Sequence, residues 1–185
     1  AWCRNCPSTP QGLAEASHRL QAALGEADAK VLLSCLEFIQ PHPDQAVQIL
    51  AKQGLQRLVI MPYLLGHGKH ATEEMEEVLG ELRAKLPQVQ LELTQGLGVD
   101  SRMADLVVER VQDLDGVAPT PSDSKGDVGI LMVKAGTKTQ YDDCLWMQEL
   151  GQMVEQRLGM GYAVEVAQSH YGDPTMPVAA AKLVE

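Results

Sequence analysis

Residues 58–70, LVIMPYLLGHGKH, decide the fold class of this chain. The stretch begins with a short apolar run, 58–61, which is typical of a buried strand. Pro62 ends that strand, because proline cannot donate a ladder hydrogen bond. Gly66 and Gly68 then allow the backbone to turn tightly, and apolar residues at helical spacing follow. The stretch is therefore a strand, a glycine-rich loop and the start of a helix.

The rest of the chain repeats this alternation of strands and helices. Continuous apolar strands separated by helices favour an α/β fold, with a parallel sheet flanked by helices on both faces. Ligands of such sheets bind beyond the carboxyl ends of the strands. Helices are predicted over 13–24, 44–53, 75–86 and 101–114, and strands over 31–36 and 89–93, with residues 1–4 as the end of a further strand.

A change of composition divides the chain. Residues 115–127, DGVAPTPSDSKGD, are rich in proline, glycine, serine and aspartate, as in a linker. The strand and helix pattern then restarts, with strands at 130–133 and 162–166 and a helix between them that ends near Leu158. The sequence thus predicts a complete α/β repeat at 1–114, a linker at 115–127 and a partial second repeat at 128–185.

An internal similarity supports the two repeats. Residues 31–50 align without gaps onto residues 164–183. Identical residues occur at four pairs of positions, namely Val31 and Val164, Pro41 and Pro174, Ala46 and Ala179, and Leu50 and Leu183. The second repeat stops halfway, after its second helix begins, and such a half-repeat leaves an open sheet edge. We therefore expect either a truncated two-lobe protein or an edge that another chain covers.

Composition excludes several classes of protein. The 185 residues carry a formal net charge of −10, which argues against a nucleic-acid scaffold. No apolar run approaches the roughly 18 residues that a membrane span needs. Four cysteines are too few for a disulfide framework and favour a reducing, cytoplasmic location. The sequence contains no complete nucleotide-binding motif, so no nucleotide cofactor is expected.

The loop of residues 66–70 holds the best candidates for chemistry. His67 and His70 stand three residues apart, and neutral imidazole is a common ligand of transition metals. Glu73 and Glu74 follow in the first turn of the predicted helix, where they could orient a histidine or accept protons. The simpler interpretation of these glutamates is that they complement the helix dipole.

The chain resembles the class II chelatases, which insert a divalent metal into sirohydrochlorin or a related tetrapyrrole. The stretches that carry the resemblance are residues 36–41, 59–70 and 96–106, and the restart after the linker is similar to the two-repeat members. The resemblance implies a lyase of cobalamin or siroheme biosynthesis. Its substrates would be a cyclic tetrapyrrole and a divalent metal, cobalt or iron, with nickel as an alternative.

The resemblance also implies roles for individual residues. His70 occupies the place of a metal-binding histidine, with Glu37 and Glu74 as proton acceptors or supporting groups. The tetrapyrrole of this family bears many carboxylates, so cationic and glycine-rich positions at the strand ends would meet it. These positions are Arg4, Gly66, Gly68, Lys69 and Lys134.

The chain departs from the family at the first strand. The family carries a second metal-binding histidine there, whereas residues 2–8, WCRNCPS, contain none. Three interpretations stay open: Cys6, with or without Cys3, binds the metal as a thiolate; the site has lost its metal; or the Cys3–Cys6 pair serves a redox or cluster role. A degenerate, non-catalytic tetrapyrrole or metal carrier, or an assembly partner, is therefore the alternative function.

Three further histidines complete the candidates. His170 stands at the repeat position of Glu37 and is expected on the wall of the same kind of cleft. His18 and His42 are expected on the surface. A homodimer could bring two copies of His70 to one cleft and so restore a second histidine.

Overall fold

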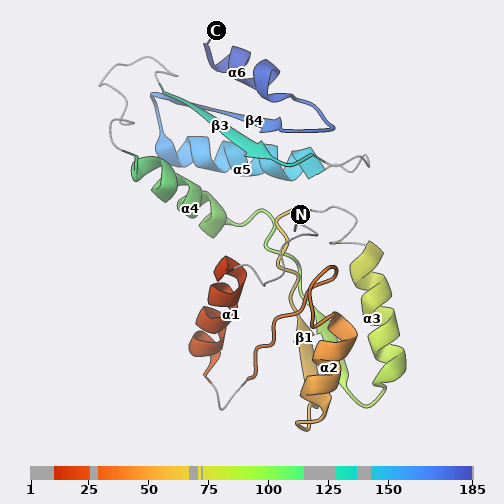
Figure 1. Ribbon diagram of the computed structural model, residues 1–185. Helices are drawn as coiled ribbons and strands as arrows, with labels where there is room; N and C mark the ends of the chain where they lie inside the picture. Colours follow the sequence, from red (N-terminus) through yellow and green to blue (C-terminus); the bar gives the residue numbers. More distant parts are fainter. Residues whose placement is uncertain are drawn as a thin grey trace. The chain divides into compact units, whose positions relative to one another are not determined.

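The computed structural model describes residues 11–25, 29–66, 71, 73–114, 128–136 and 143–184. The chain forms two compact units, residues 1–60 with 77–92 and residues 61–76 with 93–185. Each unit is described by itself (Figure 1). The predicted strand at 1–4 and the predicted linker at 115–127 lie outside the described residues, so the predicted division into repeats and linker stays a prediction.

The first unit is built around a small sheet in which β1 (Arg57–Ile60) neighbours β2 (Gln90–Leu93). Arg57 donates from Nε and Nη2 to the Glu92 carboxylate across the two strands, at 3.0 and 2.8 Å. These hydrogen bonds lower the pKa of Glu92 and raise that of Arg57. The helices of this part of the chain are α1 (Gln11–Leu24), α2 (Pro43–Ala51) and α3 (Glu73–Lys85).

One predicted strand of this unit is wrong. Residues 31–36 do not form a strand in the structure but run irregularly into the turn before α2. Their backbone donors are bound elsewhere: the Val31 N–H donates to Gln21 Oε1 at 2.7 Å, and the Cys35 N–H donates to the Pro41 carbonyl at 3.0 Å. An apolar run alone cannot show which partner its backbone donors will find.

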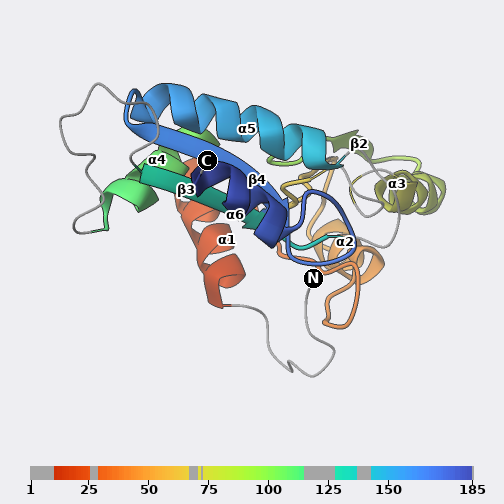
Figure 2. The same cartoon turned by 90° about the horizontal axis from the view of Figure 1, so that it is seen from above.

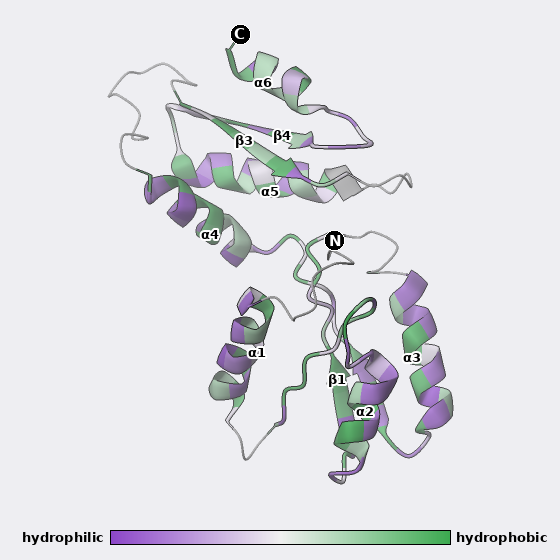
Figure 3. Ribbon diagram, in the orientation of Figure 1, coloured by the Kyte–Doolittle hydropathy of each residue, from purple (hydrophilic) through white to green (hydrophobic). Residues whose placement is uncertain are grey.

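The second unit contains the parallel pair that the sequence predicts. Strand β3 (Val128–Lys134) pairs in parallel with β4 (Tyr162–Gln168), from Val128 opposite Tyr162 to Lys134 opposite Gln168. Helix α5 (Asp143–Leu158) and helix α6 (Met176–Val184) cover opposite faces of this pair (Figures 1 and 2). Strand β3 is predominantly hydrophobic, as a strand covered on both sides should be (Figure 3).

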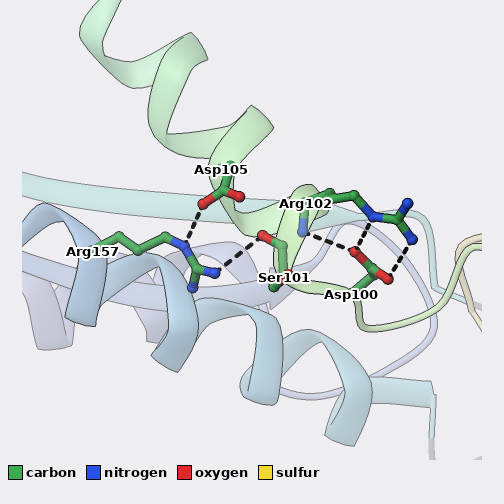
Figure 4. Close-up of polar contacts among 5 residues, drawn as sticks. All are labelled: Asp100, Ser101, Arg102, Asp105 and Arg157. Atoms are coloured by element: carbon green, nitrogen blue, oxygen red, sulfur yellow. Dashed lines mark hydrogen bonds and ion pairs between the residues drawn. The ribbon is translucent and has the colours of Figure 1, made fainter.

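The core of the second unit lies where α4 (Ser101–Gln112) meets α5. Ala104, Leu150 and Val154 form a fully or almost fully buried cluster. Polar contacts at the edge of this packing join the same helices: Arg157 of α5 donates to Asp105 Oδ1 at 2.6 Å and to the Ser101 carbonyl at 3.2 Å (Figure 4). The packing and these contacts fix α4 on α5.

The two segments that align in the sequence, 31–50 and 164–183, have matching turns and helices in the structure. Helices α2 and α6 begin and end at positions that differ by 133 residues. The same offset relates two aromatic residues with positive φ, Phe38 at 66° and Tyr171 at 61°. It also relates two backbone hydrogen bonds that close the turns, Cys35 N–H to Pro41 and Gln168 N–H to Pro174. Each turn contains one cis peptide bond before its proline.

Candidate functional site

The predicted site residues divide into two sets. Arg4, Cys6, Gly68, Lys69 and His70 lie outside the described residues, as does His67. Their roles therefore stay predictions. The four that the structure does describe are Glu37, Glu74, Gly66 and Lys134.

Gly66 lies at the stem of the histidine loop, against an aromatic side chain. A Cβ atom at Gly66 would stand 2.9 Å from Nε1 of Trp146, closer than such atoms approach in proteins. The Nε1–H of Trp146 is buried and has no hydrogen-bond partner among the described residues. Gly66 is thus needed because the indole of α5 occupies the space of a side chain, which is a different reason from the tight turn that the sequence suggested.

A second glycine supports the same stem. The Leu97 N–H donates to the Leu64 carbonyl at 2.9 Å, and a Cβ atom at Gly96 would stand 2.9 Å from the same oxygen. The segment 96–98, one of those that carry the chelatase resemblance, therefore packs on the residues that lead into the histidine loop. Glycine at position 96 is required for that close approach of two backbones.

Asp100 and Arg102 follow this segment at the start of α4. The Asp100 carboxylate accepts from the Arg102 N–H at 2.9 Å and from Arg102 Nε and Nη2 at 2.8 and 2.9 Å (Figure 4). The side-chain hydrogen bonds from Arg102 hold the pKa of Asp100 far below its ordinary range. This carboxylate is consequently an N-cap of α4 and a poor proton acceptor.

Glu74 lies in the first turn of α3, together with Glu73 and Glu76. Its side chain is half-buried, whereas those of Glu73 and Glu76 are exposed. Three acidic residues at a helix N-terminus complement the helix dipole, which satisfies the simpler interpretation. Of these three glutamates Glu74 is the half-buried one, and it stands four residues after His70 in the sequence.

Glu37 and Phe38 occupy the tip of the turn between residues 35 and 41. Both side chains are exposed, and the Glu37 carbonyl accepts from the Ile39 N–H at 2.8 Å. The left-handed backbone of Phe38 is unusual for a bulky residue. The prediction that His42 is exposed is wrong: it is half-buried, with Nδ1 3.0 Å from the Cys35 carbonyl, because it helps to close this turn.

Lys134 and His170 are brought together at the carboxyl ends of β3 and β4. The Ser169 N–H donates to the Lys134 carbonyl at 2.9 Å, which continues the pairing of the two strands. A Cβ atom at Gly136 would stand 1.4 Å from the His170 carbonyl oxygen, so the two loops touch through their backbones. The two residues thus lie at the kind of sheet edge beyond which ligands bind, and their roles stay predictions. The side chain of Lys134 is half-buried.

Sequence reasoning missed three residues that shape these sites, Trp146, Gln168 and Tyr171. Gln168 is only 8% exposed, and its Nε2 donates to the Asp173 carbonyl at 3.0 Å. The internal alignment could have pointed to Gln168 and Tyr171, since they correspond to Cys35 and Phe38. Nothing in the sequence pairs Trp146 with Gly66. Among the described residues, no three His, Cys, Asp or Glu side chains form a group that could hold a metal ion.

The structure defines an α/β protein with two matching turn-and-helix segments, and the sequence Gly-His-Gly-Lys-His stands at residues 66–70 after strand β1. The family model described as CbiX matches residues 7–114, more than half of the chain. The chain therefore belongs to the CbiX family, and the resemblance to the class II chelatases is confirmed. Whether the chain departs from the family at residues 2–8 stays a prediction.

Two curated relatives illustrate the similarity. The sirohydrochlorin ferrochelatase of Priestia megaterium is 28% identical over 132 residues, which cover 71% of this chain and 46% of that protein. The sirohydrochlorin cobaltochelatase of Sulfurisphaera tokodaii is 29% identical over 79 residues, 43% of this chain and 62% of that protein. The matched region thus spans about half of the longer relative and less than two thirds of the shorter one.

Two solved structures show the fold. SirB from Bacillus subtilis with Fe3+ has a TM-score of 0.74 at 17% identity and covers 94% of this chain and 66% of its own. The sirohydrochlorin chelatase SirB from Bacillus subtilis subspecies spizizenii in complex with cobalt has a TM-score of 0.61 at 13% identity, over 96% and 76%. The predicted chelatase-like α/β fold is confirmed. Within the described residues, no helix is long and apolar enough to cross a membrane.

Proposed function

We propose that this protein inserts a divalent metal, cobalt or iron, into sirohydrochlorin or a closely related tetrapyrrole in cobalamin or siroheme biosynthesis. The observation that carries the proposal is the CbiX match over residues 7–114, which includes the histidine loop. Relatives named as cobaltochelatases and as ferrochelatases support both metals. Nickel is the remaining alternative, and no nucleotide is required.

The reaction replaces two pyrrole N–H protons of the macrocycle with one divalent ion. The protein must hold the ion loosely, present it to one face of the ring and accept the protons. In the proposal His70 holds the metal substrate, and Cys6 supplies a thiolate in place of the missing histidine. Glu37 and Glu74 accept the protons, since an exposed and a half-buried carboxylate can both exchange them with water.

The rest of the site orients the substrate. Gly66, set against Trp146, fixes the stem of the loop that carries His70, and Gly68 lets that loop turn. Arg4, Lys69 and Lys134 meet the carboxylates of the tetrapyrrole. Because the chain carries a net charge of −10, these contacts act only within about 8–10 Å, the distance over which salt leaves charges unscreened.

The second candidate function is a non-catalytic carrier or assembly partner that binds a tetrapyrrole or metal. The observation that favours it is the stretch WCRNCPS at residues 2–8, which lacks a histidine. A homodimer that brings two copies of His70 to one cleft would offset this loss. Mass photometry that finds only monomers would contradict the dimer. The proposal places the protein in the cytoplasm, consistent with its few cysteines.

The test is anaerobic absorbance of sirohydrochlorin with Co²⁺ and then Fe²⁺, with and without protein. Wild type should convert the free-base spectrum faster than the background reaction, and His70→Ala should lose that rate. His18→Ala, a substitution on the exposed surface of α1, is the matched control and should keep it. A band shift without a rate above background would establish the carrier instead, and no shift with any metal would contradict both functions.

A further inference from the structure

The turn between β4 and α6 is held in one shape by buried contacts. The Gln168 N–H donates to the Pro174 carbonyl at 2.8 Å, and its side-chain amide donates to the Asp173 carbonyl. Gly172 lies directly on this amide, since a Cβ atom there would stand 2.4 Å from Gln168 Nε2. Gly136 encloses the turn from the end of β3. The turn is therefore preorganised before any ligand binds.

This fixed turn exposes two aromatic side chains. Tyr171 is 66% exposed although its backbone is left-handed, a conformation that bulky residues rarely adopt. Such outliers persist where the surrounding structure imposes them, and they concentrate at functional sites. The Tyr171 ring lies 6.0 Å from the His170 ring, at an interplanar angle of 40°. The two tilted rings are both exposed to solvent.

The imidazole of His170 is held in place by a neighbouring hydroxyl. Ser169 Oγ lies 2.8 Å from His170 Nδ1. A carboxylate that binds at Nε2 selects the tautomer in which the hydroxyl donates to Nδ1 and the ring proton resides on Nε2. The described residues provide no other hydrogen-bond partner for the ring, so Nε2 can then donate to that carboxylate.

The turn also lines a hollow of about 650 Å³, open to solvent. The residues that line it include Ser169, His170, Tyr171, Asp173 and Thr175. Asp173 is already engaged in an interaction of its own. The ligand that suits this surface is a planar ring with carboxylate side chains, because His170 Nε2 can donate to a carboxylate while the tyrosine ring offers an apolar face.

We propose that residues 168–175 bind a carboxylate side chain of the tetrapyrrole, with His170 Nε2 as the donor and Tyr171 as the surface for the adjoining part of the ring. This inference rests on the proposed function and assigns a substrate contact to the second repeat. The corresponding residue of the first repeat is Glu37, which would repel a carboxylate. A metal site at the turn is disfavoured because the described residues supply no group of three suitable ligands.

The test measures sirohydrochlorin binding without metal by anaerobic absorbance titration, with uroporphyrin as a second, air-stable probe. His170→Ala should raise the Kd about tenfold, the loss expected for one hydrogen bond to a charged group. His170→Gln, which keeps an N–H donor, should restore part of the affinity. His18→Ala is the matched control and should bind as wild type does. Co²⁺ binding without tetrapyrrole should be unchanged in all three variants.

The outcomes separate this inference from the proposed function. If wild type binds sirohydrochlorin and His170→Ala binds it equally well, the inference is wrong and the proposed function stands. If wild type binds neither tetrapyrrole, both are wrong. If His170→Ala and His170→Gln lose Co²⁺ affinity as well, His170 acts on the metal or on folding, and the inference is again overturned. Circular dichroism of each variant checks that the fold is retained.

Discussion

The turn at residues 35–41 and the turn at residues 168–174 have nearly the same backbone and different chemistry. Each has an aromatic residue in the left-handed conformation at its tip and leads into a helix whose first buried residue is an alanine, Ala46 or Ala179. At the position before the aromatic residue, the first turn has Glu37 and the second has His170. The same backbone conformation thus presents a carboxylate in one turn and an imidazole in the other.

The strands that lead into the two turns differ as well. Strand β4 pairs along its whole length with β3, whereas residues 31–36 are irregular and pass their N–H donors to a glutamine side chain and to the turn. The backbone conformation of the turn therefore does not depend on strand pairing of the residues that precede it. What the turns share is the hydrogen bond that closes them, and this allows their side chains to diverge. The two proposals accordingly assign the first repeat to the metal and its protons, and the second to the carboxylates of the macrocycle.

The largest expected effect breaks the second turn alone. Gly136→Ala places a Cβ atom 1.4 Å from the His170 carbonyl oxygen, so one of the two backbones must shift just beyond the ends of β3 and β4. We expect a loss of about 4 kcal/mol or more in the free energy of unfolding, measured by urea denaturation. The control is Gly80→Ala in α3, where a Cβ atom meets nothing within 4 Å. It should stabilise the protein by about 0.5–1 kcal/mol. Equal stabilities of the two variants would contradict the close contact.

The next largest effect is expected in the buried core of the second unit, away from the turn. Leu150→Ala empties part of the cluster with Ala104 and Val154, and should cost about 2–5 kcal/mol of unfolding free energy. Leu145→Ala on the same helix is the control, because that side chain is 59% exposed; it should stay within about 0.5 kcal/mol of wild type. Thermal and urea denaturation both report the difference. A Leu150→Ala variant as stable as Leu145→Ala would mean that α4 and α5 do not pack as described.

A smaller effect tests whether the two turns have equivalent left-handed backbones. At Phe38 and Tyr171, asparagine tolerates the left-handed backbone better than alanine does. In each turn the Asn variant should therefore be more stable than the Ala variant, by up to about 1 kcal/mol. Both Tyr171 variants should also bind sirohydrochlorin more weakly. A gain in only one turn would show that the two backbones are not equivalent.

The smallest effect depends on pH and concerns the cap of α4. Because Arg102 lowers the pKa of Asp100 in the folded protein, the carboxylate stabilises the fold above its unfolded pKa of about 3.9. This stabilisation disappears as the pH falls through the lower folded pKa. Asp100→Asn should therefore have a lower Tm than wild type near neutral pH, and the difference should shrink in acid below about pH 4. A difference in Tm that does not change with pH would contradict the ion pair.

Most of the order of helices and strands, and the internal similarity, could be predicted from the sequence. Periodicity predicted β1, β2, β3, β4 and helices α1 to α5 close to their observed bounds, because each has a strong apolar pattern, and the internal alignment predicted α6. It failed at residues 31–36, where the pattern is equally apolar but the hydrogen-bond partners are local. Hydrophobic periodicity carries no information about which groups will accept the backbone N–H hydrogen bonds.

The candidate site could be predicted only in part. The repeat alignment placed His170 opposite Glu37, and the structure confirms that their turns correspond. The contact of Gly66 with Trp146 could not be predicted, because it joins residues 80 positions apart in the sequence through packing alone. The same holds for Gly136 and His170, whose backbones meet only once β3 and β4 are paired.

The most direct test of the account is the steady-state kinetics of cobalt insertion by Glu37→Gln and His170→Ala. In the proposals Glu37 accepts the pyrrole protons, and His170 binds a carboxylate of the macrocycle. Glu37→Gln should therefore lower kcat about a hundredfold and leave the KM for sirohydrochlorin unchanged. His170→Ala should raise that KM about tenfold and leave kcat unchanged. If both variants changed the same parameter, or if neither changed any, the division of labour between the two repeats would be contradicted.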